Sequence, residues 1–255
     1  MADSKPQYTL QERLLSPPPA SEPYQLSDEV EKKGGYMSQF GQDRWVDSVF
    51  QGREALFVVE AGACDGEHYS NSLFLELRRS WECLLVEASP TFMEKLVTKM
   101  RKAHVLNGGL SITDSFSTFS FKLAGSNSGI VSSYSEKHAA KVDGDLANEQ
   151  WWMYEDKGQV VEVPCWPLHD VLKALGRSVV DYWSLDTEGS ELEILKNTRF
   201  DIVEIGVLTV EHNKETDRKT AIKDIMESNG FQRVKEGEVE DYYANPNYFQ
   251  KRGWP

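Results

Sequence analysis

A chain of 255 residues with a net charge of -13 is long enough to bury one sizeable core, and we expect a single domain. Hydrophobic residues make up 40% of it and charged residues 27%, as in soluble globular proteins. Because nucleic acids bind to basic surfaces, the acidic balance argues against a nucleic-acid partner. It favours a neutral or cationic small molecule, or a protein.

The three cysteines, Cys64, Cys83 and Cys165, are far apart and odd in number. They therefore indicate buried free thiols in a reducing compartment. No apolar run approaches the length of a membrane span, and the N-terminus lacks the basic and then apolar layout of a signal peptide. We expect a cytoplasmic protein.

The N-terminal part of the chain differs in composition from the rest. Residues 1–33 hold a proline-rich stretch and a charged run with few apolar side chains, so we expect a flexible tail there and one domain over 34–255. An apolar stripe over 45–50 predicts a short helix before the first strand. Gln39 and Gln42 beside it face either a ligand or solvent.

The stretch 57–67 has the outline of a nucleotide-binding turn. An apolar run that predicts a buried strand ends in Glu60, passes through a loop with Gly62 and Gly66, and leads into a helical pattern. Glycine adopts backbone angles closed to other residues, and the first turn of a helix offers unpaired N–H groups to a ligand. Strand-to-helix turns also use glycine for steric reasons alone, so the loop by itself is weak support for a site.

Strands and helices alternate through the rest of the chain, and crossover helices join parallel neighbours, which predicts a doubly wound α/β sheet. We expect strands over 81–87, 104–106, 160–165, 179–185, 202–210, 231–234 and 242–249, and helices over 73–79, 89–100, 170–175, 190–196 and 221–230. Alternating residues over 117–123 predict an added antiparallel strand.

Residues 125–158 break this rhythm, and a long irregular insertion is more often a binding loop or lid than filler. Trp151 and Trp152, with Tyr154 near them, suit a cover over an apolar or cationic acceptor. The same side chains equally suit packing of the insertion onto the sheet.

A polar residue stands at the carboxyl end of successive strands: Glu60, Glu87, Asn107, Asp186 and Glu211. Any one of them is explained by a helix cap or a solvated acid. Because ligands of open α/β sheets bind beyond the carboxyl ends of the strands, the whole series on one edge favours a site there.

Two cofactors compete for such an edge. A nicotinamide dinucleotide needs a glycine in the middle of the loop, where Cys64 would crowd the pyrophosphate. S-adenosylmethionine has no phosphate and needs one acid near its ammonium and another on its ribose. Glu60 and Glu87 supply such a pair.

Several separated motifs, in the right order, resemble the FkbM-type methyltransferase family, with the animal Star-like proteins as the nearest branch. They are SQFGQD at 38–43, VEAGACDGE at 59–67, SNSL at 70–73, LVE at 85–87 and SLDTEGSE at 184–191. The resemblance implies a class I methyltransferase (Rossmann-like) fold with a doubly wound seven-stranded sheet whose last strand is antiparallel. It also implies S-adenosylmethionine as the methyl donor.

The resemblance places the glycine loop of the donor site at 62–66 and the ribose acid at Glu87. It matches polar family positions at the start of the first helix, and it puts the adenine contact near Asn107. The donor-binding residues expected are Gln39, Gln42, Glu60, Gly62, Ala63, Asp65, Gly66, Ser70, Asn71, Glu87, Ala88, Asn107, Gly108 and Asp186.

Methyl transfer requires positioning of the acceptor and removal of its proton. Asp186 is the first choice for a group that faces the acceptor, with Glu188, Glu211 and His212 as weaker choices. The alternatives are that Glu188 caps the next helix and that His212 is an exposed loop residue. Asp186, Glu211 and Asn213 also resemble the three oxygen ligands of magnesium-dependent O-methyltransferases. Magnesium fits there, but the sequence does not require it, and we predict no metal ligand.

The sequence therefore predicts an S-adenosylmethionine-dependent methyltransferase that acts on an oxygen of a small molecule. The main rival is a non-catalytic Star-like trafficking or scaffold protein that keeps the fold. The retained acids and glycines disfavour it, as does the lack of the membrane anchor that Star-like relatives often carry. A nicotinamide oxidoreductase is the third hypothesis, and Cys64 disfavours it.

Overall fold

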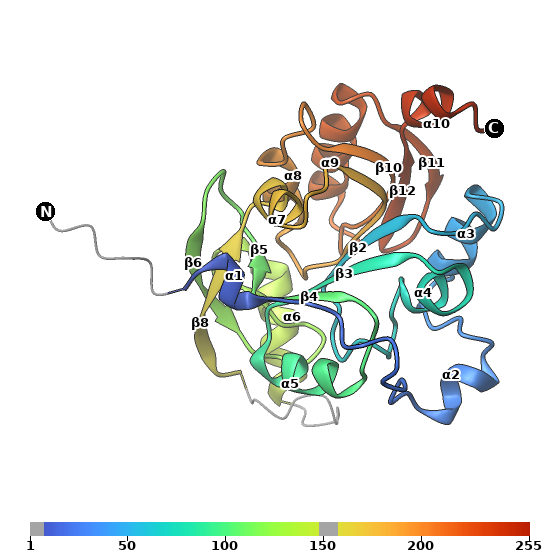
Figure 1. Ribbon diagram of the computed structural model, residues 1–255. Coiled ribbons are helices and arrows are strands. Elements are labelled where there is room, and N and C mark those ends of the chain that lie inside the picture. Colours follow the sequence, from blue (N-terminus) through green and yellow to red (C-terminus); the bar gives the residue numbers. More distant parts are fainter. Residues whose placement is uncertain (1–7, 148–157) are drawn as a thin grey trace, which may run out of the picture.

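The computed structural model describes residues 8–147 and 158–255 (Figure 1). Its centre is an eight-stranded sheet in the order β1-β4-β3-β2-β9-β10-β12-β11. The strands are β1 Leu14–Leu15, β2 Phe57–Ala61, β3 Glu82–Glu87, β4 His104–Asn107, β9 Val179–Leu185, β10 Glu204–Glu211, β11 Gln232–Glu236 and β12 Glu240–Ala244. Strands β4, β3, β2, β9 and β10 are parallel, and β12 lies antiparallel between β10 and β11. The class I methyltransferase fold and its antiparallel last strand are thus confirmed.

Helices cover both faces of this sheet (Figure 1). One layer contains α3 Gln42–Val49, α4 Leu73–Arg79, α5 Pro90–Thr98 and α10 Pro246–Arg252, and the other contains α7 Leu168–Ala174, α8 Glu191–Lys196 and α9 Thr216–Ser228. The central strand β2 alternates between the two layers, because Val58 joins one apolar cluster and Phe57 and Val59 join the other. All three side chains are buried, which explains the continuous apolar run in the sequence.

A second, four-stranded sheet lies at one side, in the order β5-β8-β6-β7. It consists of β5 Gly109–Leu110, β6 Ser117–Lys122, β7 Gly129–Ile130 and β8 Val160–Trp166. The predicted antiparallel strand over 117–123 is confirmed as β6, which pairs antiparallel with β8 and with β7. Strand β8 therefore belongs to this smaller sheet and not to the central one.

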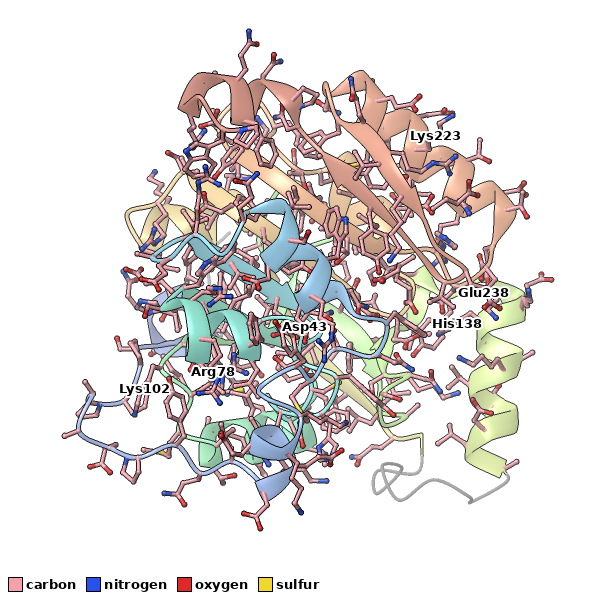
Figure 2. The ribbon with its side chains drawn as sticks, turned by 90° about the vertical axis from the view of Figure 1, so that its right-hand side faces the viewer. Asp43, Arg78, Lys102, His138, Lys223 and Glu238 are labelled. Carbon is pink, nitrogen blue, oxygen red and sulfur yellow. The ribbon has the colours of Figure 1, made fainter. Side chains whose placement is uncertain are left out.

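The segment predicted as an irregular insertion contains regular structure. It forms the 3-10 turn η1 Val131–Ser133 and helix α6 Glu136–Ala147, at the right of Figure 2. His138 and Val142 are four residues apart, so they lie on one side of α6, where both are buried. The expectation about Trp151, Trp152 and Tyr154 falls outside the described residues.

The N-terminal segment also differs from the flexible tail expected over 1–33. Within residues 8–33 the structure has α1 Leu10–Arg13, the edge strand β1 and α2 Asp28–Lys32. Thr9 and Glu12 cap α1 reciprocally, β1 pairs antiparallel with β4, and Val30 of α2 is buried. The few apolar side chains of this segment therefore pack against the domain. The central sheet therefore has one strand more than the seven expected.

The C-terminal prediction of a strand over 242–249 is wrong beyond Ala244. Asn245 caps a new helix by accepting a hydrogen bond from the N–H of Asn247, and Pro246 occupies the first helical position. Tyr248 of this helix is fully buried, and its hydroxyl donates a hydrogen bond to Asp181 of β9.

In the two described ranges, no helix combines the length and the apolar character needed to cross a membrane. The cysteines are free thiols, as predicted. Cys83 and Cys165 are buried, and Cys64 is half-buried.

Candidate active site

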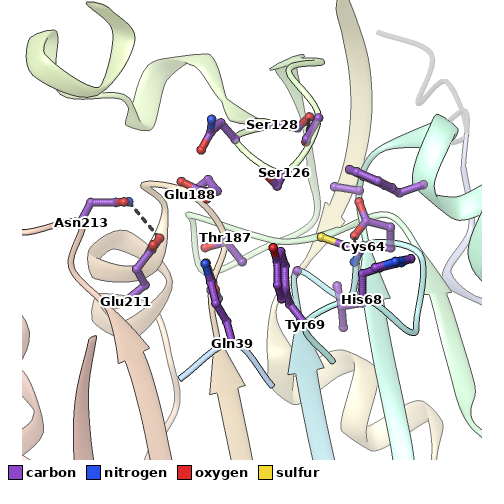
Figure 3. Close-up of a pocket in the computed structure, with 18 of the residues that line it drawn as sticks. Gln39, Cys64, His68, Tyr69, Ser126, Ser128, Thr187, Glu188, Glu211 and Asn213 are labelled. Carbon is purple, nitrogen blue, oxygen red and sulfur yellow. Dashed lines mark hydrogen bonds between the residues drawn. The ribbon is translucent and has the colours of Figure 1, made fainter. Parts of the chain in front are cut away.

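A cavity of about 470 Å³ lies beyond the carboxyl ends of the parallel strands, between the central sheet and the second sheet (Figure 3). Glu87 at the end of β3, Asp186 after β9 and Glu211 at the end of β10 line it from the central sheet. Gly109 of β5 and Phe121 of β6 line it from the second sheet. The predicted edge therefore carries the cavity, and its volume is in the range of small-molecule sites.

The two glycines of the first loop serve close packing. Gly62 has a φ of 89°, and a Cβ atom there would lie 1.8 Å from the carbonyl oxygen of Asp186. Gly66 has a φ of 76°, and a Cβ atom there would lie 3.1 Å from Leu96 of α5. Gly62 lines the cavity, but Gly66 does not, so only the first lies where a ligand can approach the backbone.

Cys64 occupies the middle of this loop with a φ of 50°, a left-handed conformation that is uncommon outside glycine. Its backbone N–H donates a hydrogen bond of 2.7 Å to Oε2 of Glu87, and its side chain lines the cavity. Burial, together with the negative charges of Glu87 and Asp186, raises the pKa of the Cys64 thiol well above its usual value. The thiol is therefore protonated at neutral pH.

Glu87 is buried, with 5% of its surface exposed, and its carboxylate accepts backbone hydrogen bonds from Cys64, Ser89 and Ala88. Oε2 accepts from Cys64, and Oε1 accepts from Ser89 at 2.7 Å. Burial raises the pKa of Glu87 to about 7, although these hydrogen bonds act in the opposite direction. Because a carboxylate oxygen can accept two hydrogen bonds, Glu87 retains acceptor capacity on the wall of the cavity.

Glu60 does not line the cavity. Its Oε1 accepts a 2.6 Å hydrogen bond from the N–H of Asn71, and its Oε2 accepts hydrogen bonds from the hydroxyls of Ser70 and Ser72. Burial raises the pKa of Glu60 above its usual value. Glu60 thus holds the segment before α4 in place, and that segment presents Asn71 to the cavity.

Asn71 has an orphaned acceptor. Its Nδ2 donates to Ser184 at 2.8 Å, whereas its buried Oδ1 has no hydrogen-bond partner. Because buried polar atoms are nearly always paired, an unpaired acceptor on the wall of a cavity indicates a place for a ligand donor such as an ammonium group.

The structure divides the predicted donor-binding residues into two groups. Those that line the cavity are Gln39, Gly62, Asn71, Glu87, Ala88 and Asp186. Those that lie outside its lining are Gln42, Glu60, Ala63, Asp65, Gly66, Ser70, Asn107 and Gly108.

The residues outside the lining have local roles. Asp65 accepts hydrogen bonds from the N–H groups of Glu67 and His68 and so fixes the turn after the loop. Asn107 pairs with Glu87 inside the sheet. On this part of the chain the cavity wall is formed by Gly109 and Leu110 instead.

Asp186, Glu188 and Glu211 form an acidic cluster on the cavity wall, with carboxylate oxygens that all lie within 4.8 Å of one another. Asn213 donates a 2.9 Å hydrogen bond to Glu211, as Figure 3 shows. Burial, and next the charge of Glu191, raises the pKa of Asp186 to about 7. Burial and the charge of Asp186 raise the pKa of Glu188 and that of Glu211 well above their usual values.

His212 does not join this cluster. It is buried, with its Nε2 3.7 Å from Oδ1 of Asp241, and its Nδ1 accepts a hydrogen bond from the N–H of Lys214. The alternative of an exposed loop residue is therefore wrong, and His212 lies outside the lining of the cavity. Glu188 does not cap the next helix either, since no side chain caps the N-terminus of α8. Glu191, the first residue of α8, instead accepts hydrogen bonds from the N–H of Thr187 and that of Gly189 and so fixes the loop before the helix.

The sequence did not predict the part of the wall that comes from β6, from the loop between β6 and β7 and from helix α6. These residues are Phe121, Gly125, Ser126, Asn127, Ser128, Lys141 and Asp145. Tyr69 was also missed, although it lines the cavity with a φ of 59° and 48% exposure. The one available signal was the break in the βα rhythm, which marks a region and not individual side chains.

The family model described as "Methyltransferase FkbM domain" matches residues 60–233. The chain therefore belongs to the FkbM methyltransferase family, and this membership implies the use of S-adenosylmethionine. A comparison with curated proteins found no match.

Among solved structures, precorrin-6y C5,15-methyltransferase from Geobacter metallireducens is 12% identical, with 79% of this chain and 84% of that chain covered and a TM-score of 0.40. A methyltransferase from Pyrococcus furiosus is 12% identical, with coverage of 78% and 79% and a TM-score of 0.38. A putative RNA methyltransferase from Pyrococcus horikoshii is 12% identical, with coverage of 80% for each chain and a TM-score of 0.40.

The residues of the cavity fit this methyl donor. Glu87 offers acceptor oxygens for ribose hydroxyls, and the orphaned Oδ1 of Asn71 offers one for an ammonium group. The donor has no pyrophosphate to admit, so the Cys64 side chain in the loop is no obstacle.

Proposed function

We propose that this protein transfers a methyl group from S-adenosylmethionine to a hydroxyl oxygen of a small-molecule acceptor. The observation that carries the proposal is that Glu87 and the acidic cluster of Asp186, Glu188 and Glu211 line one cavity. One end of that cavity has the groups that suit the donor. The other has carboxylates that suit an acceptor with a proton to lose.

The donor end lies at the ends of β2 and β3. There Glu87 is placed to accept hydrogen bonds from the ribose hydroxyls, and Asn71 is placed to accept one from the ammonium group. Gly62 also lines the cavity, and its lack of a side chain leaves room for the carbonyl oxygen of Asp186, so the turn packs directly against the end of β9. When bound, S-adenosylmethionine supplies an electrophilic methyl group on a positively charged sulfur.

The acceptor end lies at the ends of β9 and β10. Asp186 has a pKa of about 7, and a carboxylate with such a value can take a proton from a hydroxyl group near neutral pH. Glu188 and Glu211 lie beside it, and burial and the charge of Asp186 raise the pKa of each, so both tend to hold protons. Asp186 is therefore the residue that we assign to proton removal in the donor complex.

The size and charge of the protein support a small acceptor that is neutral or cationic. The cavity has a volume of about 470 Å³, and its acceptor end presents carboxylates to the ligand. A net charge of -13 disfavours a nucleic acid or a phosphorylated acceptor, because these need basic contacts.

Titration calorimetry with S-adenosylmethionine and S-adenosylhomocysteine tests the donor end, and absence of binding by both would end the proposal. Transfer of a labelled methyl group to a fractionated metabolite extract tests the acceptor end. We expect a labelled small molecule whose methyl ether is identified by mass spectrometry. Label on a nitrogen atom, on RNA or on a protein would contradict the proposed acceptor.

Asp186→Asn separates catalysis from binding. We expect it to lower methyl transfer about 100-fold or more, while donor affinity changes much less. The rival, a non-catalytic Star-like scaffold, predicts donor binding without transfer to any fraction of the extract, in the wild-type protein as in the variant.

A further inference from the structure

Lys141 lies near the acidic cluster and its charge acts on Glu188, but its Nζ donates a hydrogen bond to Oδ1 of Asn127. In residues 8–147 and 158–255, none of the ion pairs joins a lysine or arginine to Asp186, Glu188 or Glu211. Arg218 lies near, but it pairs with Glu191 and Glu215. Three half-buried carboxylates, with one oxygen of each within 4.8 Å of the others, repel one another unless protons or a cation offset their charge.

A second observation comes from helix α6, which brings a histidine close to the acidic cluster. His138 is 3% exposed and lies between α6 and the body of the protein (Figure 2). Its Nε2 has no hydrogen-bond partner and is 3.8 Å from Oε2 of Glu188, which also has none. A buried imidazole nitrogen thus faces a buried carboxylate oxygen, with neither atom paired.

The 3.8 Å gap is too long for a hydrogen bond, which spans about 2.7–3.2 Å. It matches the separation of two ligands on one metal ion. Ligands that are each about 2.1 Å from an ion lie about 3.0 Å apart at a right angle and about 4.2 Å apart when opposed. The gap between His138 and Glu188 lies within that range.

We propose that Asp186, Glu188, Glu211 and His138 bind a divalent transition-metal ion. Carboxylates alone suit Mg²⁺ or Ca²⁺, but an imidazole nitrogen beside them favours a first-row transition ion such as Mn²⁺ or Fe²⁺. The Nε2 atom of His138, which has no hydrogen-bond partner, is the type of imidazole nitrogen that binds metal ions.

The role of the ion rests on the proposed function, whereas its binding does not. At the acceptor end of the cavity, a cation would attract the hydroxyl oxygen of the acceptor and make its proton easier to remove. Asp186 would then act on the acceptor through the ion. Metal binding is measurable without donor or acceptor, so it can fail while methyl transfer stands, and the reverse is also true.

The test is a titration of the full chain, treated with a chelator and dialysed, with Mn²⁺ as the probe. The signal of free Mn²⁺ in electron paramagnetic resonance reports the unbound ion. We expect one Mn²⁺ per chain, and at least tenfold weaker binding in Glu188→Gln and in His138→Gln. Glu136→Gln is the matched control, because Glu136 is exposed on the same helix, and its affinity should equal that of the wild type.

A parallel titration in which Mg²⁺ competes with Mn²⁺ isolates the contribution of His138. The wild type should prefer Mn²⁺, and His138→Gln should lose at least part of that preference. Circular dichroism and donor titration check that each variant is folded. The proposal is overturned if the folded wild type leaves millimolar Mn²⁺ unbound, or if both variants bind it as the wild type does.

Discussion

Gly62 and Asp186 meet so closely that no side chain fits between them. A Cβ atom on Gly62 would lie 1.8 Å from the carbonyl oxygen of Asp186, which joins the turn after β2 to the end of β9. The same strands are paired, with Ala61 beside Leu185 and the N–H of Asp186 donating to the carbonyl of Ala61. The donor and acceptor ends of the cavity therefore share one rigid junction.

Gly62→Ala should destabilise the fold by at least about 3 kcal/mol, because a left-handed φ and a steric overlap add together. Gly176→Ala is the matched control. Gly176 also has a positive φ, of 68°, but nothing lies within 4 Å of a Cβ atom there, so we expect a loss of about 1–2 kcal/mol. Urea unfolding measures both. Equal losses would show that the contact with Asp186 adds nothing.

Glu87→Ala should weaken donor binding by about 2 kcal/mol, or about 30-fold, since two charge-assisted hydrogen bonds to the ribose are lost. Glu94→Ala is the control, because Glu94 is an exposed acid on α5 and should bind the donor as the wild type does. Titration calorimetry with S-adenosylhomocysteine measures both variants. An unchanged affinity in Glu87→Ala would remove Glu87 from the donor site.

Donor affinity should depend on pH through the same residue. The pKa of Glu87 is about 7 in the donor-free protein, and the ionised form accepts the ribose hydroxyls, so affinity should fall by about 50-fold from pH 7 to pH 5. Among its charged neighbours, Asp65 stays ionised over this window, because hydrogen bonds from His68 outweigh burial and lower its pKa. The Cys64 thiol stays protonated, since its pKa is raised.

Glu87→Gln should remove most of this pH dependence, and a slope that survives in the variant would assign it to another group. The stability of the donor-free protein depends on pH in the opposite direction to donor affinity. The folded state holds a proton on Glu87 that the unfolded state loses near pH 4.5, so the contribution of Glu87 to the stability of the donor-free protein falls as pH rises from about 4.5 to about 7.

The strand ends were predictable because apolar runs stop at polar residues, and parallel strands bring those residues to one edge. The burial of Glu60 was not predictable in the same way. Glu60 lies beside Leu85, one residue before the end of β2, whereas Glu87 ends β3 and lines the cavity. The difference depends on Ser70 and Ser72, which bond to Glu60 across a loop whose path the sequence does not specify.

The position of His138 beside the acidic cluster could not be predicted from the sequence, for a similar reason. In the sequence it is one polar residue in a segment without a βα pattern, far from Glu188. Only the path of the chain after β7 brings α6 over the cavity, so that the two side chains meet. Such contacts depend on long-range packing, whereas periodicity reports local structure.

Arg101 links the stability of the fold to the donor site. Its Nε donates a 2.8 Å hydrogen bond to Glu76, with the two side chains 1% and 2% exposed, and its Nη2 donates to Ser72 at 3.0 Å. Its Nη1 donates to the carbonyl oxygen of Gly66. One buried cation therefore holds the loop after β2 and the start of α4 together.

Arg101→Met should destabilise the protein by about 3–5 kcal/mol, because it leaves Glu76 as a buried carboxylate without its partner. Arg78→Met is the control, since Arg78 pairs with Glu31 at the surface, where the side chains are 43% and 84% exposed. A surface pair contributes about 1 kcal/mol or less. Urea unfolding distinguishes the two losses, and similar values would show that burial of the Arg101 pair is not what matters.

Donor titration below the unfolding transition adds a functional readout to the Arg101 variant. Ser70 and Ser72 bond both to Arg101 and to Glu60, and Asn71 lies between them with its Oδ1 available to a ligand. Loss of the guanidinium should therefore loosen Asn71 and weaken donor binding, while Arg78→Met leaves it intact. Wild-type affinity in folded Arg101→Met would show that Glu60 alone is enough to position Asn71.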